Sequence, residues 1–128
     1  MWQNYKPIFP DGTGTKSDPF IIKDDGLLDL ADYVNQGGNT RGVYFKQEGD
    51  INAEVILAHR GMANQWGPMG YIQVFEGDYD GDGYRIINAK NTATELPYNG
   101  IFGKVSGSIH NLGVEGCDLQ TSDLKSVV

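Results

Sequence analysis

The sequence predicts an all-β fold with a single helix, arranged either as a short parallel β-solenoid or as a β-sandwich. Glycine accounts for 18 of the 128 residues, well above its usual share of about 7%. Each glycine inside a helix costs about 1 kcal/mol, whereas turns accommodate it readily. After Gly42 the apolar residues occur in short β-prone runs, and a helical period is present only before it. The length suits one domain over residues 1–128.

The chain opens with a loop and a short strand. Residues 10–19 are almost entirely turn formers and small polar groups, which predicts a loop. Phe20-Ile21-Ile22 is apolar and β-branched and is bounded by polar residues on both sides. This run predicts a strand of three or four residues.

The segment from Leu27 to Gln36 has the period of an amphipathic helix, because its apolar side chains fall on one helical face. Asp24 or Asp25 is expected to cap its first amides. Gly37-Gly38 are expected to end it in the left-handed conformation. The prediction is a helix of about three turns.

Six short β-prone runs follow the helix, at residues 43–45, 55–57, 71–75, 84–87, 101–105 and 109–114. Ile86-Ile87-Asn88-Ala89 and Ile109-His110-Asn111-Leu112 share the pattern Ile-x-Asn-apolar, and Asp50-Ile51-Asn52-Ala53 is a looser copy. Such spacing suits one coil of a parallel solenoid, in which strands of successive coils stack. A β-sandwich gives a similar spacing of strands, so both folds remain open.

Several segments match a known family in their order along the chain. They are Gly14 to Ile22, Leu28 to Asn35, Gly42 to Gln47, Asp50 to Asn52, Trp66-Gly67-Pro68-Met69-Gly70, Phe75 to Ile86, Gly100 to Val105, and Ile109 to Leu112. Together they resemble the N-terminal part of bacterial GLUG-motif proteins, from about Gly12 to Val114. Met69, Asp82 and the run Gln47-Glu48-Gly49 depart from that pattern.

The resemblance implies a right-handed parallel β-helix of about three coils, with the Leu27 to Gln36 helix closing the first coil. It also implies a secreted or cell-surface location, although the given chain has no signal peptide. The expected unit is the N-terminal cap and first coils of a longer bacterial protein. A helix that covers the end of such a stack hides unpaired strand edges.

The resemblance also implies a function. It favours a non-catalytic structural or adhesion-type module whose partner is a surface glycan or protein. The alternative is the N-terminal fragment of a β-helix carbohydrate-active enzyme, either a polysaccharide lyase or a glycoside hydrolase, so enzymatic activity stays an open question at this stage.

The charge balance excludes some classes of partner. With 17 acidic and 10 basic residues, the net charge of −7 repels nucleic acid phosphates and anionic lipid surfaces. No apolar stretch approaches the roughly 20 residues that span a bilayer. We therefore expect neither nucleic acid binding nor a membrane span.

A group of closely spaced acidic residues is the strongest candidate for a metal-binding or catalytic site. Asp78, Asp80 and Asp82 stand at positions 1, 3 and 5 of a calcium-loop pattern, and glycine stands at position 6. The closing ligand is missing, because position 12 is Ala89. The alternatives are a tight Asp-Gly turn and, together with Glu76, a pair of carboxylates for glycoside hydrolysis. No cofactor is expected, and calcium is the candidate metal.

Aromatic side chains are the candidates for ligand binding, because they stack on sugar rings. We predict that Trp66 and Tyr98 bind the ligand. The alternative role of these two side chains is packing in the core. Neither His59 nor His110 has a serine or cysteine nucleophile in its sequence context. Cys117 lies among acidic residues that would raise its pKa, so a catalytic triad is not expected.

Overall fold

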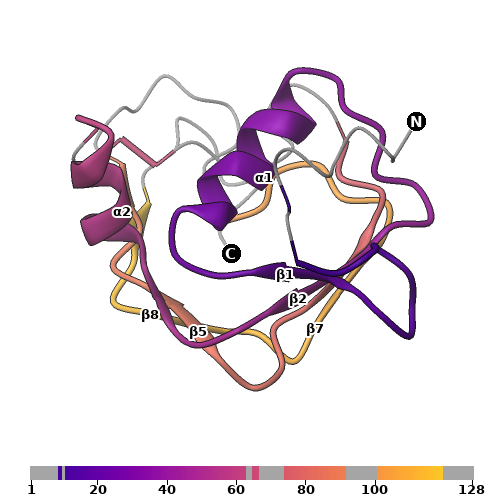
Figure 1. Ribbon diagram of the computed structural model, residues 1–128. Helices are drawn as coiled ribbons and strands as arrows, with labels where there is room; N and C mark the ends of the chain where they lie inside the picture. Colours follow the sequence, from indigo (N-terminus) through magenta and orange to yellow (C-terminus); the bar gives the residue numbers. More distant parts are fainter. Residues whose placement is uncertain (1–8, 10, 63–64, 67–73, 92–100, 120–128) are drawn as a thin grey trace.

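The structure is a computed structural model that describes residues 9, 11–62, 65–66, 74–91 and 101–119. The described residues form nine short strands and two helices (Figure 1). In chain order these are β1 (Phe20–Ile22), α1 (Gly26–Asn35), β2 (Tyr44–Gln47), β3 (Ile51–Asn52), α2 (Ala53–His59), β4 (Asp78–Asp80), β5 (Arg85–Ile87), β6 (Lys90–Asn91), β7 (Ser108–His110), β8 (Gly113–Glu115) and β9 (Asp118–Leu119).

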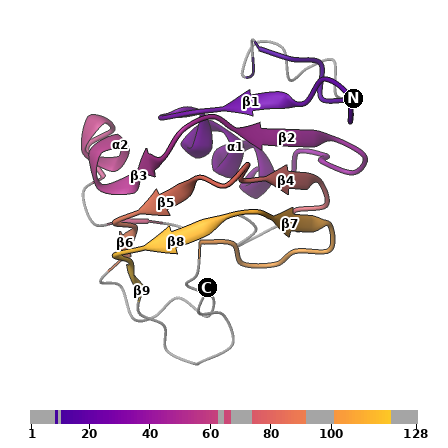
Figure 2. The same cartoon turned by 90° about the horizontal axis from the view of Figure 1, so that it is seen from below.

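The strands form three small sheets in which every neighbouring pair is parallel. The strand orders are β1-β2-β4-β7, β3-β5-β8 and β6-β9. Figure 2 shows β1, β2, β4 and β7 stacked in chain order, with β3, β5 and β8 stacked beside them. Residues at matched positions on successive strands therefore lie next to one another.

The expected fold class is wrong. The described residues contain two helices and three small parallel sheets and form no closed solenoid, so the fold is mixed α/β. It is neither an all-β chain with one capping helix nor a right-handed parallel β-helix of about three coils. The β-sandwich alternative is wrong as well, because such sandwiches are built from antiparallel sheets and all the sheet pairs described here are parallel.

The second helix, α2, replaces the strand expected at residues 55–57. The Asn52 side chain accepts hydrogen bonds from the backbone N–H groups of Glu54 and Val55, which caps the helix. Ile56 and Leu57 are buried, whereas Val55 is 46% exposed. Residues 55–57 are therefore helical, with Ile56 and Leu57 on the buried side and Val55 on the exposed side, and the local cap prevails over β-propensity.

The first helix is confirmed as α1, with the expected apolar face buried. Its N-terminus differs from the prediction, because Asp25 occupies the N-cap without a side-chain hydrogen bond and Asp24 adopts a positive φ of 48°. At the other end Gly37 has a φ of 93°, as expected for a left-handed stop.

The short strand Phe20–Ile22 is confirmed, but the predicted repeat aligns differently. Ile51 lies opposite Ile86 and Asn52 lies opposite Ile87, so two of the three copies lie side by side but one residue out of the predicted alignment. Ile86 then lies opposite Val114, and Ile109 lies opposite Tyr79. The run 109–114 is thus divided between β7 and β8 in different sheets. Residues 71–73 lie outside the described residues.

An aromatic column fills the core beneath the four-stranded sheet. Neighbouring rings lie with centroids 5.5 to 6.0 Å apart, the range of favourable ring contacts. The column comprises Phe9, Phe20, Phe45, Phe75 and Phe102, all of which are buried. It supports the inner face of the sheet, whereas the outer face of β2, β4 and β7 carries mainly polar residues.

Candidate functional site

The outer face of the four-stranded sheet carries the acidic residues singled out in the sequence. In β4 the Tyr79 side chain is buried, whereas Asp78 and Asp80 are half-buried on the opposite face. This alternation follows from the two-residue period of a strand. In the register, Asp80 lies opposite Lys46 on one side and His110 on the other.

His110 is the centre of a small polar cluster. Its Nε2 lies 2.8 Å from Asp78 Oδ1, and its Nδ1 lies 3.8 Å from Asp80 Oδ1. Asn111 Nδ2 lies 3.2 Å from both His110 Nδ1 and Asp80 Oδ1. The hydrogen bond to Asp78 raises the pKa of His110 above 6.5. Partial burial lowers this pKa, whereas the negative charges of Asp78 and Asp80 raise it further.

The Asp-Gly turn after β4 determines the surroundings of Asp80. Partial burial raises the pKa of Asp80, but the hydrogen bonds from the Asp82 backbone and the Asn111 side chain, with the charges of His110 and Lys46, lower it overall. The Asp82 backbone N–H donates to Asp80 Oδ1 at 2.8 Å. Asp82 itself has a φ of 52° and pairs with Lys46 at 3.8 Å.

The side chain closest to each of the three aspartates is therefore a different one, although His110 Nδ1 also lies 3.8 Å from Asp80. Asp78 contacts His110, Asp80 contacts Asn111, and Asp82 contacts Lys46. Within the described part of the chain, no group of three or more His, Cys, Asp or Glu side chains is arranged to hold a metal ion. Calcium stays a candidate ligand of these aspartates, and its effect on the melting temperature is the test.

A shallow pocket of about 220 Å³ lies on the same face. It is lined by Lys16, Pro19, Tyr44, Phe45, Asp78, Asp80 and His110. The loop that bears Lys16 is held in place by three backbone N–H groups that donate to the Asp18 carbonyl, and by the Tyr44 N–H, which donates to Gly14 O at 2.9 Å. The pocket thus combines an aromatic ring, two carboxylates, an imidazole and an ammonium group.

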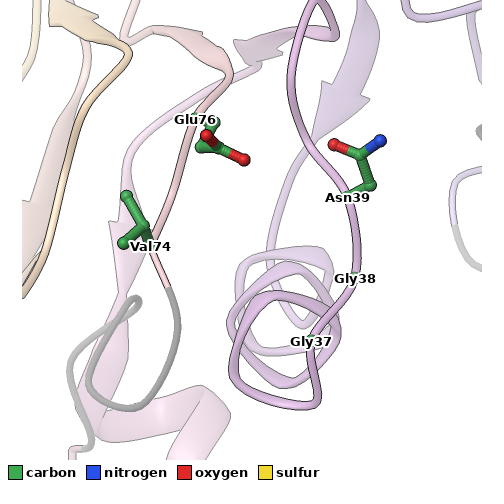
Figure 3. Close-up of a pocket in the computed structure, with 5 residues that line it drawn as sticks. All are labelled: Gly37, Gly38, Asn39, Val74 and Glu76. Atoms are coloured by element: carbon green, nitrogen blue, oxygen red, sulfur yellow. The ribbon is translucent and has the colours of Figure 1, made fainter.

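A second pocket, of about 280 Å³, lies between the end of α1 and the segment before β4. Figure 3 shows Asn39 and Glu76 extending toward each other from its two walls, with Gly37, Gly38 and Val74 completing the lining. Arg41 Nη2 contacts Glu76 Oε2 at 3.0 Å. The described residues of its lining include one carboxylate and no aromatic ring, so they provide fewer groups for ligand binding than those of the first pocket.

Of the two predicted ligand-binding aromatics, Trp66 is not among the described residues that line either pocket. Trp66 is 0% exposed, and its backbone N–H donates to the Lys90 carbonyl at 3.0 Å, which fits the core role. Tyr98 lies outside the described residues. The sequence reasoning missed Tyr44, although its signal was present in the alternation of Tyr44 and Lys46 with the buried Phe45.

The described residues do not assemble a nucleophilic triad. The side-chain hydrogen bonds of His110 go to Asp78 and Asn111. His59 lies 3.6 Å from Asp25 in a separate cluster. The Cys117 thiol is free of disulfide bonding and contacts the Glu115 carbonyl at 3.6 Å. Across the described ranges, none of the helices has the length and apolar character needed to cross a membrane.

The described residues define a small module of stacked parallel strands that carries a pocket of mixed charge. The chain is similar to part of the "Putative Gly-rich membrane protein" of Evansella cellulosilytica, with 32% identity over 113 residues. That match covers 85% of this chain and 12% of that protein. It is also similar to part of halomucin from Haloquadratum walsbyi, with 29% identity over 122 residues that cover 88% of this chain and 1% of halomucin.

The chain therefore spans only a small fraction of the length of the relatives that it matches. No protein-family model matches it. No solved structure matches it significantly either.

Proposed function

We propose that this chain is a non-catalytic structural or adhesion-type module of an exported or cell-surface protein, and that its partner is a surface glycan or protein. The main support is the match of nearly the whole chain to a small part of two much longer proteins, one named as a membrane protein and the other as halomucin. The resemblance to GLUG-motif surface proteins belongs to the same proposal.

The surface ion pairs support a structural role, because they join successive strands. Arg85 on β5 contacts Asp50 at 2.8 Å and also pairs with Glu115 on β8. Lys23 and Glu48, 3.8 Å apart, join the ends of β1 and β2. Each exposed pair contributes little energy alone, but pairs repeated between layers favour one register of stacking.

The chemistry of the acidic cluster supports a non-catalytic role. A glycoside hydrolase needs one carboxylic acid with a raised pKa to protonate the leaving group. The pKa of Asp80 is lowered instead, so this group is ionised at neutral pH. The histidine beside it contacts an aspartate and an asparagine, and neither is a nucleophile of the serine or cysteine type.

The location is tested by antibody labelling of intact source cells. An antibody raised against the folded chain is expected to label unpermeabilised cells, and brief external protease treatment should remove the signal. A cytosolic protein labelled in parallel controls for lysis. Labelling only after permeabilisation would contradict the proposal.

A further inference from the structure

We infer that the pocket between the loop at Lys16 and the strands β2, β4 and β7 binds a single uncharged sugar residue of a glycan. This inference rests on the proposed function and assigns a site and a ligand class to it. The six side chains that carry it are Lys16, Pro19, Tyr44, Asp78, Asp80 and His110.

The chemistry of the lining fits a sugar. One side of a pyranose ring presents C–H groups, which pack against aromatic and proline rings such as those of Tyr44 and Pro19. Sugar hydroxyls are donors and acceptors together. The carboxylates of Asp78 and Asp80 already contact His110, Asn111 and the Asp82 backbone N–H. They can accept further hydrogen bonds, since each ionised carboxylate offers about four acceptor positions.

Size and charge narrow the ligand class. A volume of about 220 Å³ is below the range of about 300 to 1,000 Å³ that is usual for drug-sized ligands, so the pocket suits one ring rather than an oligosaccharide. In the lining, the carboxylates of Asp78 and Asp80 balance the positive charges of Lys16 and His110, and the chain as a whole carries a net charge of −7. The pocket therefore has no excess of positive charge to attract an acidic sugar. An uncharged hexose or N-acetylhexosamine is therefore the expected ligand.

The frame of the pocket is assembled before any ligand binds. Three parallel strands fix its residues: Tyr44 on β2 lies opposite Asp78 on β4, and Asp80 on β4 lies opposite His110 on β7. The loop at Lys16 is tied to β2 through the hydrogen bond from the Tyr44 N–H to Gly14 O. A site with little to reorganise loses less entropy when it binds. A shallow single-ring site is nevertheless expected to bind weakly, with a Kd of about 1 mM.

The test is a nuclear magnetic resonance titration of the full 128-residue chain with methyl glycosides of glucose, galactose, mannose and N-acetylglucosamine, and with glucuronic acid as the acidic comparison. At least one neutral glycoside should shift the amide signals of Tyr44, Asp78 and His110. Tyr44→Ala should weaken that binding at least about tenfold, or about 1.4 kcal/mol, whereas Tyr44→Phe should retain it.

Tyr84→Ala is the matched control, because Tyr84 is 39% exposed and is not among the residues that line the pocket. It should leave the affinity unchanged. Asp78→Asn offers a second variant that should weaken binding even if Tyr44→Ala fails to fold. Absence of shifts with every neutral glycoside, tighter binding of glucuronic acid, or full affinity in folded Tyr44→Ala would overturn the inference. If the antibody labels intact cells but any of these results is obtained, the sugar site is wrong and the proposal of a surface module is unaffected.

Discussion

The Tyr79 hydroxyl donates a hydrogen bond to Gln47 Oε1 at 2.7 Å, and both side chains are buried. Gln47 Nε2 in turn donates to the carbonyls of Gly49 and Arg85, each at 2.9 Å. Burial raises the pKa of Tyr79, which keeps its hydroxyl protonated as a donor. This network joins the four-stranded sheet to the three-stranded sheet through the interior.

Tyr79→Phe is therefore expected to lower the free energy of unfolding by about 1 to 3 kcal/mol, since it leaves the buried Gln47 oxygen without its donor. Urea unfolding followed by circular dichroism measures the change. Tyr84→Phe removes the hydroxyl of an exposed tyrosine and serves as the control. Equal unfolding midpoints for Tyr79→Phe and the parent chain would show that the hydrogen bond contributes nothing.

Gly107 allows two backbone segments to approach closely. A Cβ added at this position would lie 2.0 Å from Gly77 O and 2.7 Å from Glu76 C. Gly107→Ala should therefore destabilise the fold by at least about 1 to 3 kcal/mol, the usual cost of overpacking. Gly26→Ala is the matched control at the start of α1, where an added Cβ meets nothing within 4 Å. It should be neutral or stabilising by up to about 1 kcal/mol, and a larger loss there than at Gly107 would refute this explanation.

Arg60 connects the two helices. Its Nη2 contacts Asp29 at 2.8 Å, and its other nitrogens lie 3.7 Å from Asp25 and 3.6 Å from Asp32. The hydrogen bond to Asp29, with the charges of all three aspartates, raises the pKa of Arg60. Arg60→Gln should reduce stability by about 1 kcal/mol, discounted because the side chain is partly exposed. Melting temperatures at low and high salt measure the effect, and the difference from the parent should shrink as salt screens the charges. A difference that does not depend on salt would contradict the electrostatic explanation.

His110 should make stability depend on pH near neutrality. Its pKa is raised in the folded state by the hydrogen bond to Asp78, so folding favours the protonated imidazole. The stabilisation is fully present below the unfolded pKa of about 6.5 and is lost as pH rises through the higher folded pKa. Lys16, Asp78 and Asp80 line the same pocket and determine the local charge.

The unfolding midpoints of the parent and of His110→Gln, measured across this pH range, should converge as pH rises. The imidazole titration of His110, followed by nuclear magnetic resonance, should move to a lower pKa in Asp78→Asn. A titration of His110 that is the same in both proteins would exclude Asp78 as the cause.

Calcium is the remaining candidate ligand of Asp78, Asp80 and Asp82. Because these side chains contact His110, Asn111 and Lys46, we expect the melting temperature to be the same in excess calcium and in chelator. A rise in calcium that disappears in Asp80→Asn would reveal a metal site instead. Lys90→Ala is a control for general charge effects, since Lys90 pairs with Glu54 at 3.7 Å, outside this cluster.

Parts of the fold could be predicted because the signal was local. The apolar face of α1 and the turn-bounded strand β1 depend on residues close in sequence, and both were found. The helix α2 was missed because its run Val55-Ile56-Leu57 has the composition of a strand. The opposing signals were the Asn52 cap, Glu54 in the first turn and His59 in the last turn. The predicted fold class was wrong for the same reason, since a helix occupies residues that were expected to form a strand.

The candidate site also has a part that could be predicted from the sequence and a part that could not. The sequence predicted that Asp78 and Asp80 lie together, because alternate residues of a strand share a face. Asp82 lies instead in the turn that follows β4. The sequence could not predict that His110 lies beside Asp78, or that Tyr44 lies next to both. These contacts depend on the parallel register of β2, β4 and β7. The burial of Trp66 likewise depends on neighbours distant in sequence.

The sequence by itself determined the acidic surface, the glycine-rich turns, the first helix and the spacing of the carboxylates, because each of these properties belongs to a residue or to its near neighbours. The tertiary structure decided which strands pair, which aromatic rings are covered and which charges meet. Those outcomes depend on contacts between residues far apart in the chain, where the closure of loops and the packing of one shared core select a single arrangement.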